Sequence, residues 1–151
     1  MKKLVLSTLV GAIIAAAAVM AFANPFAGAG STTQTKLIAE LTATNADPLA
    51  SGKTKWEERF VDAVLERRRT STEVEDVSTT GDHVVRVTRG NPAVEIATMT
   101  VSVDALGFGD LNLDTRDGDT VVILEEGDSV EVWTPGPDSV KILTGTLQLK
   151  Q

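Results

Sequence analysis

The sequence predicts an all-β domain, an antiparallel β-sandwich or open barrel of about eight or nine short strands. Apolar and polar residues alternate in short runs through most of the chain after residue 35, which is the period of a half-buried strand. Turn residues separate these runs every 8–12 residues or so, a spacing typical of sandwiches and barrels. The 12 glycines and five prolines fall mostly in those turns, so the local chemistry agrees with the pattern.

The expected strands can be placed in order along the chain. Polar, glycine or proline clusters end most of them, as in Asn45–Pro48, Arg89–Pro92 and Pro135–Pro137, and Asp117-Gly118 is a favoured hairpin dipeptide. Outside the ambiguous segment discussed next, the runs that we interpret as strands are 36–44, 70–77, 83–88, 94–103, 111–113, 121–124, 130–133 and 140–149.

The segment 54–69 fits two structures. Its large apolar residues recur at helical spacing, and Thr54 with Glu57 has the form of a capping box, which predicts one amphipathic helix and an α+β fold. The alternative is two strands, Lys53–Phe60 and Arg67–Val77, joined by a loop around Asp62. We prefer the two strands, because the segments on both sides have the strand period.

The first 23 residues have the order of features of a secretory signal peptide. Lys2-Lys3 precedes an apolar run from Leu4 to Met20, and Ala21-Phe22-Ala23 supplies the small residues of a cleavage site. A membrane anchor is the competing interpretation, since Leu4–Ala23 is long enough to cross a bilayer. No basic residue follows as a stop, so we predict cleavage and an exported protein, periplasmic or extracellular.

This interpretation divides the chain into three parts. Residues 1–23 are the signal peptide, residues 24–35 are a flexible polar linker, and residues 36–151 form a single β-sandwich domain. The linker is rich in small and polar residues that bury little apolar surface. The chain has no cysteine, so the core must hold the mature domain together without disulfides.

Charge and composition exclude several function classes. The chain has a net charge of −7, and cleavage removes two lysines and leaves −9, which argues against nucleic acid and anionic lipid as partners. Without cysteine, thiol catalysis and zinc–cysteine sites are excluded. His83 is the only histidine, and no Gly-x-Ser-x-Gly turn accompanies it. We therefore predict no enzyme activity, and no membrane partner after cleavage.

One group of acidic residues has the residue types of a calcium site. Asp110, Asn112 and Asp114 match the start of an EF-hand loop, but Thr115 replaces the glycine and Val121 the glutamate that this loop needs. A looser calcium site remains a candidate, formed by Asp114, Asp117 and Asp119. No other cofactor is expected.

The two tryptophans are candidates for stacking on sugar rings. An indole presents a broad apolar plate, but it is also rewarded by burial, so we expect Trp56 in the core. Trp133 stands next to a proline-rich turn and is the candidate ligand-binding residue for a carbohydrate.

Four stretches carry a resemblance: Leu111–Asp119, Glu126–Val132, Ser51-Gly52-Lys53 and Glu73–Asp76. They resemble segments of small secreted bacterial β-domains of unknown function. The resemblance implies strands within residues 53–77 and carries over no functional residue.

We expect an exported, non-enzymatic binding or structural domain of the cell envelope or extracellular space, because sheet edges can pair with another chain. An envelope protein or a polysaccharide would be its partner. The alternatives are a calcium- or carbohydrate-binding module and, last, a small secreted hydrolase.

Overall fold

The computed structural model describes residues 30–150, so the expected signal peptide and residues 24–29 of the expected linker lie outside the described part. Nine strands and one 3-10 helix make up the regular structure of that part. Their bounds are β1 Thr32–Ala43, β2 Ser51–Val61, β3 Val64–Glu75, β4 Gly81–Arg89, β5 Val94–Val103, β6 Gly109–Asp114, η1 Thr115–Asp117, β7 Ser129–Trp133, β8 Lys141–Thr146 and β9 Gln148–Leu149.

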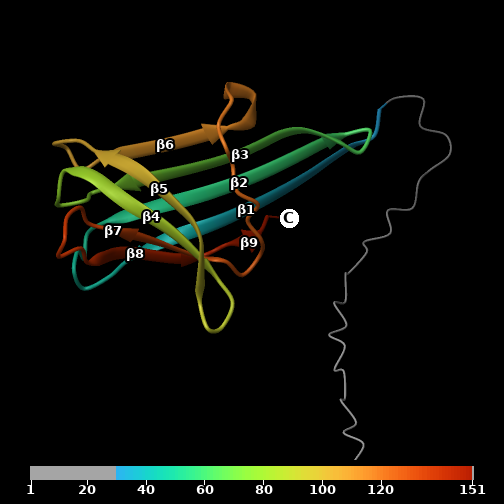
Figure 1. Ribbon diagram of the computed structural model, residues 1–151. Coiled ribbons are helices and arrows are strands. Elements are labelled where there is room, and N and C mark those ends of the chain that lie inside the picture. Colours follow the sequence, from blue (N-terminus) through green and yellow to red (C-terminus); the bar gives the residue numbers. More distant parts are fainter. Residues whose placement is uncertain (1–29, 151) are drawn as a thin grey trace, which may run out of the picture.

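The strands form a single antiparallel sheet that closes on itself as an eight-stranded barrel (Figure 1). Around the barrel the order is β1-β2-β3-β6-β5-β4-β7-β8, and β8 returns to β1. The short strand β9 adds to the edge of β1 at Leu37 and Ile38. The all-β prediction is confirmed, but the sheet is one closed barrel where we expected a sandwich or an open barrel. Residues 30–150 contain no α-helix, so this part of the chain holds no helix that could span a bilayer.

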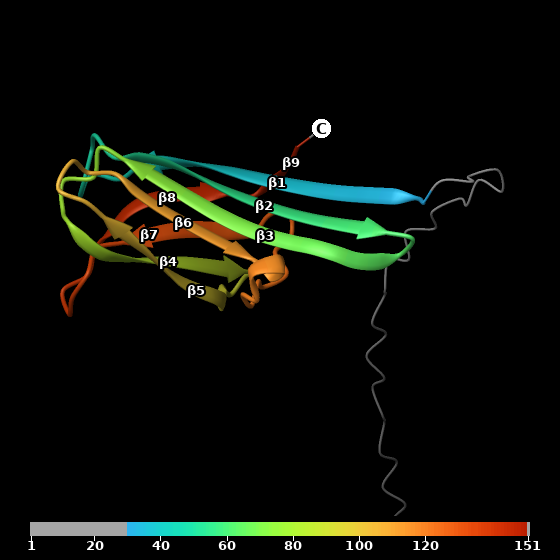
Figure 2. The same ribbon diagram turned by 90° about the horizontal axis from the view of Figure 1, so that it is seen from above.

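The ambiguous segment 54–69 is a β-hairpin, so the helix interpretation was wrong. Asp62 and Ala63 have φ of 50° and 64°, a left-handed two-residue turn whose twist matches that of the two strands. Ser31 and Asp62 exchange two hydrogen bonds of 2.9 Å at this turn. Strand β1 therefore begins at Thr32, within the expected linker. The outer ends of β1, β2 and β3 extend beyond the barrel as an arm (Figure 2).

The core fills the barrel with small and medium apolar side chains from every wall. Trp56 is its largest member and is only 3% exposed, which confirms its predicted burial. Two buried threonines on neighbouring strands, Thr54 and Thr72, form a hydrogen bond of 2.9 Å between their hydroxyl groups. The remaining fully enclosed apolar residues come from β1, β3, β4, β5, β7, β8 and the residue after β8: Ala39, Val74, Val85, Val87, Val101, Val130, Val132, Ile142, Leu143 and Leu147.

The segment between β6 and β7 closes one end of the barrel without forming a strand. We call residues 118–128 the crossing segment; Figure 1 shows it passing from η1 towards the far side of the barrel. The expected strand 121–124 was wrong, because this stretch pairs with no neighbour. Val121 and Leu124 are buried in the core. The Trp56 indole donates to the carbonyl of Val122 at 3.0 Å and fixes this segment to β2.

An ion pair fixes the other end of the crossing segment to β4. Asp128 is 1% exposed, and its two oxygens accept from Nε and Nη2 of Arg89 at 2.7 and 2.8 Å. The carboxylate also accepts from the backbone N–H of Glu125 at 2.7 Å. Arg89 donates further to Glu125 and to the carbonyl of Ile123. The hydrogen bond with Asp128 raises the pKa of Arg89 above its ordinary value.

We predict that Arg89→Ala lowers the free energy of unfolding by about 3 kcal/mol, because it leaves the buried Asp128 carboxylate without its countercharge. Urea denaturation measures the loss. Arg116→Ala is the matched control, since Arg116 and its partner Glu66 are 47% and 33% exposed, and exposed pairs contribute at most about 1 kcal/mol. Equal losses in the two variants would contradict this account of the crossing segment.

Candidate interaction site

The structure brings together two of the three predicted calcium ligands. Asp114 ends β6 and caps η1, where its carboxylate accepts from the Arg116 N–H at 3.0 Å and from Nε of Arg67 at 2.8 Å. The carboxylate of Asp119 accepts from the N–H of Asp114 at 2.9 Å. Asp117 lies exposed in η1. Each of the two paired carboxylates therefore already has protein donors.

Residues 30–150 hold no group of three or more acidic or histidine side chains placed to bind a metal ion. The calcium site stays a prediction, and in this conformation it requires Arg67 to leave Asp114. The hydrogen bond from Arg67 lowers the pKa of the Asp114 carboxyl below its ordinary 3.8, and it raises the pKa of Arg67.

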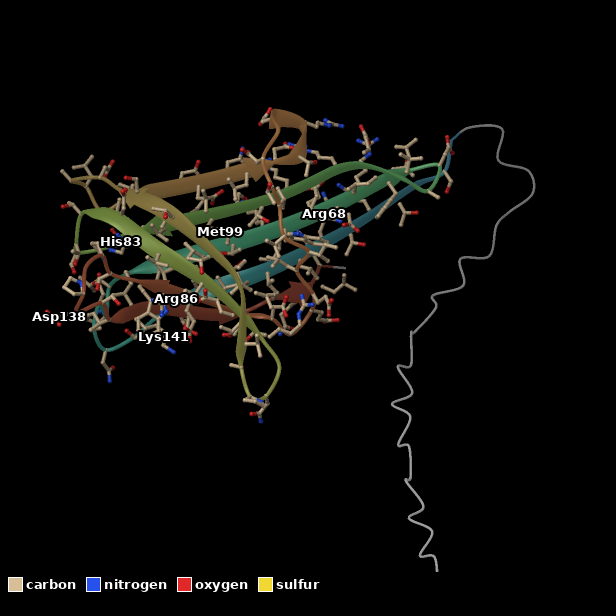
Figure 3. The ribbon with its side chains drawn as sticks, in the orientation of Figure 1. Arg68, His83, Arg86, Met99, Asp138 and Lys141 are labelled. Carbon is tan, nitrogen blue, oxygen red and sulfur yellow. The ribbon has the colours of Figure 1, made fainter. Side chains whose placement is uncertain are left out.

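Trp133 lies on the outside of the barrel at the end of β7, with two cations over its ring. The Arg86 guanidinium is 4.8 Å from the ring centroid and the Lys141 ammonium is 6.0 Å from it; Figure 3 labels both cations. The indole N–H and Lys141 both donate to Glu131, at 3.1 and 2.8 Å. A sugar that stacked on this ring would compete with Arg86, and the carbohydrate site stays a prediction.

His83, which the hydrolase alternative requires, is fully buried in β4. Its Nδ1 lies 3.0 Å from the carbonyl oxygen of Gly81, and its Nε2 has no hydrogen-bond partner among the described residues. The side chain is enclosed by the core in this conformation.

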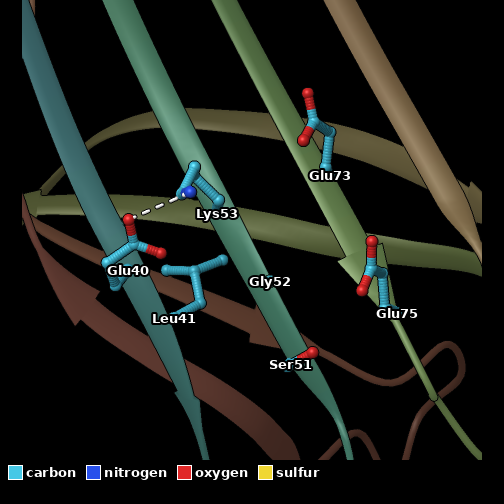
Figure 4. Close-up of a pocket in the computed structure, with 7 residues that line it drawn as sticks. All are labelled: Glu40, Leu41, Ser51, Gly52, Lys53, Glu73 and Glu75. Carbon is cyan, nitrogen blue, oxygen red and sulfur yellow. Dashed lines mark ion pairs between the residues drawn. The ribbon is translucent and has the colours of Figure 1, made fainter.

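A shallow hollow of about 260 Å³ lies on the outside of β1, β2 and β3 (Figure 4). Three glutamates surround it, and two of them are paired: Glu40 with Lys53 at 3.1 Å, and Glu73 with Lys55 at 3.0 Å. Glu75 forms no ion pair within residues 30–150. This hollow is an open, charged face of the sheet.

A second hollow, of about 420 Å³, adjoins the first and reaches the turn between β5 and β6. It shares Glu73 and Glu75 with the first hollow and adds Asp104, Asp110 and the ring of Phe108. We call it the turn hollow. Its full lining is Glu73, Val74, Glu75, Ser102, Asp104, Phe108, Gly109 and Asp110, with no basic residue among them.

The turn beside this hollow holds its apolar side chains outward. The carboxylate of Asp104 accepts from the N–H groups of Leu106 and Phe108, at 2.8 and 3.1 Å. Gly107 has φ of 83°, and a Cβ there would stand 2.7 Å from the carbonyl oxygen of Val77, so only glycine fits. Leu106 is 77% exposed and Phe108 48% exposed.

Strands β5 and β6 are neighbours in the barrel but share one residue pair, Val103 with Gly109. Figure 1 shows the two strands separating from this point. Beyond it, β5 is paired only with β4, and β6 only with β3. We call the two facing edges, residues 94–102 of β5 and 110–114 of β6, the seam.

The orientation of the backbone shows which groups face the seam. The N–H of Asp104 donates to the carbonyl of Phe108 across the turn. Backbone groups point to the same side of a strand at every second residue, so the N–H and carbonyl groups of Thr100 and Thr98 also face β6. On β6, the backbone N–H and carbonyl of Asp114 bond to Asp119 and point away from β3. The backbone groups of Asn112, two residues earlier, therefore face the seam as well. Strand pairing reaches none of the seam-facing groups of these three residues.

Apolar side chains lie beneath the same edges. Four partly buried apolar residues pack against the core, and all four belong to the two seam strands: Ile96 and Met99 on β5, and Leu111 and Leu113 on β6. Figure 3 labels Met99 on β5. Between Thr98 and the turn, the outward side chains of these strands are polar and exposed, including Thr98, Thr100 and Asp110. The seam thus has an apolar floor and a polar outer surface.

No family model, curated protein or solved structure matches this chain. The sequence analysis did not predict the seam as a binding edge, although it singled out Asp110, Asn112 and Asp114 on its β6 side as possible calcium ligands. The alternation in 94–103 and 111–113 predicts two strands, and only the short length of the second run indicates that it cannot pair with the whole of the first.

We predict that Asp114→Asn makes the protein's stability less dependent on acid pH. Because the folded pKa of Asp114 is lowered, its contribution is fully present above the unfolded value near 3.8 and is lost as the pH falls through the folded value. Between about pH 5 and pH 2, the free energy of unfolding should therefore fall less in Asp114→Asn than in the unmodified protein. Denaturant titrations at each pH measure this difference.

The control is Asp138→Asn, at an exposed residue of the loop between β7 and β8. It should retain the acid dependence of the unmodified protein. If Asp114→Asn and Asp138→Asn lose stability in parallel as the pH falls, the Arg67–Asp114 pair has no such role.

Proposed function

We propose that this protein is an exported, non-enzymatic binding domain that receives an extended segment of a partner protein as an additional strand at the seam. One observation carries the proposal: in a barrel whose other neighbours are paired over several residues or capped by β9, β5 and β6 share a single pair. Export is supported by the N-terminal sequence, which has the order of features of a signal peptide.

Strand addition uses the two kinds of group that the seam offers. The backbone N–H and carbonyl groups of Thr98, Thr100 and Asn112 provide main-chain hydrogen bonds, which give affinity. Inward side chains of the added strand would cover Met99 and Leu111, and burial of apolar surface contributes about 25 cal/mol per Å². Because β5 and β6 are antiparallel, the added strand is antiparallel to one of them and parallel to the other.

The other candidate functions have less support in the geometry. Calcium would have to displace Arg67 from Asp114, and a sugar would have to displace Arg86 from Trp133. The seam requires no displacement of a bonded group.

Proline at position 100 tests the proposal, because it removes a backbone donor that faces the seam and leaves the ladder with β4 intact. Two synthetic peptides of about ten residues serve as probes, one with valine alternating with lysine and one with valine alternating with glutamate. We expect at least one probe to bind. Thr100→Pro should weaken that binding about tenfold, as expected for the loss of a hydrogen bond at a strand edge.

Thr100→Ala is the matched control, since it keeps the N–H and should bind like the unmodified protein. Amide hydrogen exchange provides the second measurement: the bound peptide should slow exchange at Thr98, Thr100 and Asn112. Circular dichroism and urea denaturation check that both variants are folded. Equal binding by Thr100→Pro and Thr100→Ala, or binding of neither probe, would contradict strand addition.

A further inference from the structure

We infer that the strand received at the seam carries a lysine or arginine that enters the turn hollow, so that the partner is an extended segment with basic residues. This inference rests on the proposed function and adds the charge of the partner and the end of the seam at which its basic residue lies.

The turn hollow lies where the seam begins. Asp110 directly follows Gly109, the residue of β6 that makes the single pair with β5. The side chain of Asp110 is exposed and forms no ion pair within residues 30–150. On the seam side Asp110 already faces Ser102 of β5, so the first residue of an added strand stands opposite Asn112. Its outward side chain is diagonal to Asp110, at about 7–8 Å between Cβ atoms, and a lysine or arginine is long enough to reach the hollow from there.

The lining of the hollow suits a cation with an aliphatic stem. Four carboxylates surround it, and only Glu73 is neutralised by a lysine. The ring of Phe108 is half exposed at the same place. An aromatic face attracts an ammonium or guanidinium group, and the methylene groups of lysine or arginine pack on apolar surface. An acidic partner would meet like charges here.

The charge differs between the two ends of the seam. At the open end, towards η1, Arg67 is neutralised by Asp114, and Arg69 donates to the amide oxygen of Asn112 at 2.5 Å. Arg69 has no acidic partner among residues 30–150. The turn hollow at the closed end holds carboxylates and no cation, so an added strand is best accommodated with its basic residues towards the turn.

The valine–lysine and valine–glutamate peptides test this inference in the full chain. At low salt, we expect the unmodified protein to bind the lysine peptide at least about tenfold more tightly than the glutamate peptide. Asp110→Lys should abolish or reverse this preference. Asp138→Lys makes the same change of charge at an exposed residue of the β7–β8 loop, and it should keep the preference.

The outcomes separate the two proposals. If both peptides bind equally and Thr100→Pro weakens both, strand addition is supported and the basic partner is overturned. If Asp138→Lys loses the preference as fully as Asp110→Lys, net charge explains the selectivity, and the turn hollow is overturned as its source. If neither peptide binds, the proposed function fails together with this inference.

Discussion

The barrel depends on the crossing segment, because this segment fills the end that strand pairing leaves open. Val121 and Leu124 bring apolar surface to that end, and two side-chain donors hold them there: the indole of Trp56 and the guanidinium of Arg89. The bidentate pair of Arg89 with the buried Asp128 fixes the far end. The crossing segment therefore connects β2 with β4, the two strands that flank β3, β6 and β5 in the barrel order.

The chain contains no cysteine, and arginine–aspartate pairs fix the irregular segments where disulfides are often found in small exported domains. Arg67 with Asp114 fixes the start of η1, and Arg89 with Asp128 fixes the return to β7. In both pairs the carboxylate is almost completely buried and also accepts a backbone N–H. Removing one partner would leave a buried charge, so each pair is costly to break even though its formation contributes little by itself.

The sequence predicted what depends on local alternation and missed what depends on distant partners. Alternation in the neighbouring segments favoured the hairpin around Asp62, and the large apolar area of the indole predicted the burial of Trp56. The strand prediction failed at 121–124, where four consecutive apolar residues show no alternation, and a short apolar run alone does not distinguish a strand from a buried irregular segment. It could not separate a sandwich from a closed barrel, because both have the same pattern. Asp114 has the appearance of a metal ligand in sequence, and only the fold reveals Arg67, which is 47 positions away.

The seam differs from the other exposed edges of this sheet in how it is protected. Proteins usually protect strand edges with charges, prolines, bulges or covering segments. Here β9 covers part of β1, and at the base of the arm the Thr115 hydroxyl accepts the N–H of Arg68 on β3. The edge of β5 has a charge at Glu95 and a bulge at Ile96, but it has neither charge, proline nor bulge at Thr98 and Thr100. This unprotected part of the edge lies above partly buried apolar side chains, which favours pairing with another chain. The contrast with β1 and β3 therefore supports the seam as the place where a partner strand is received.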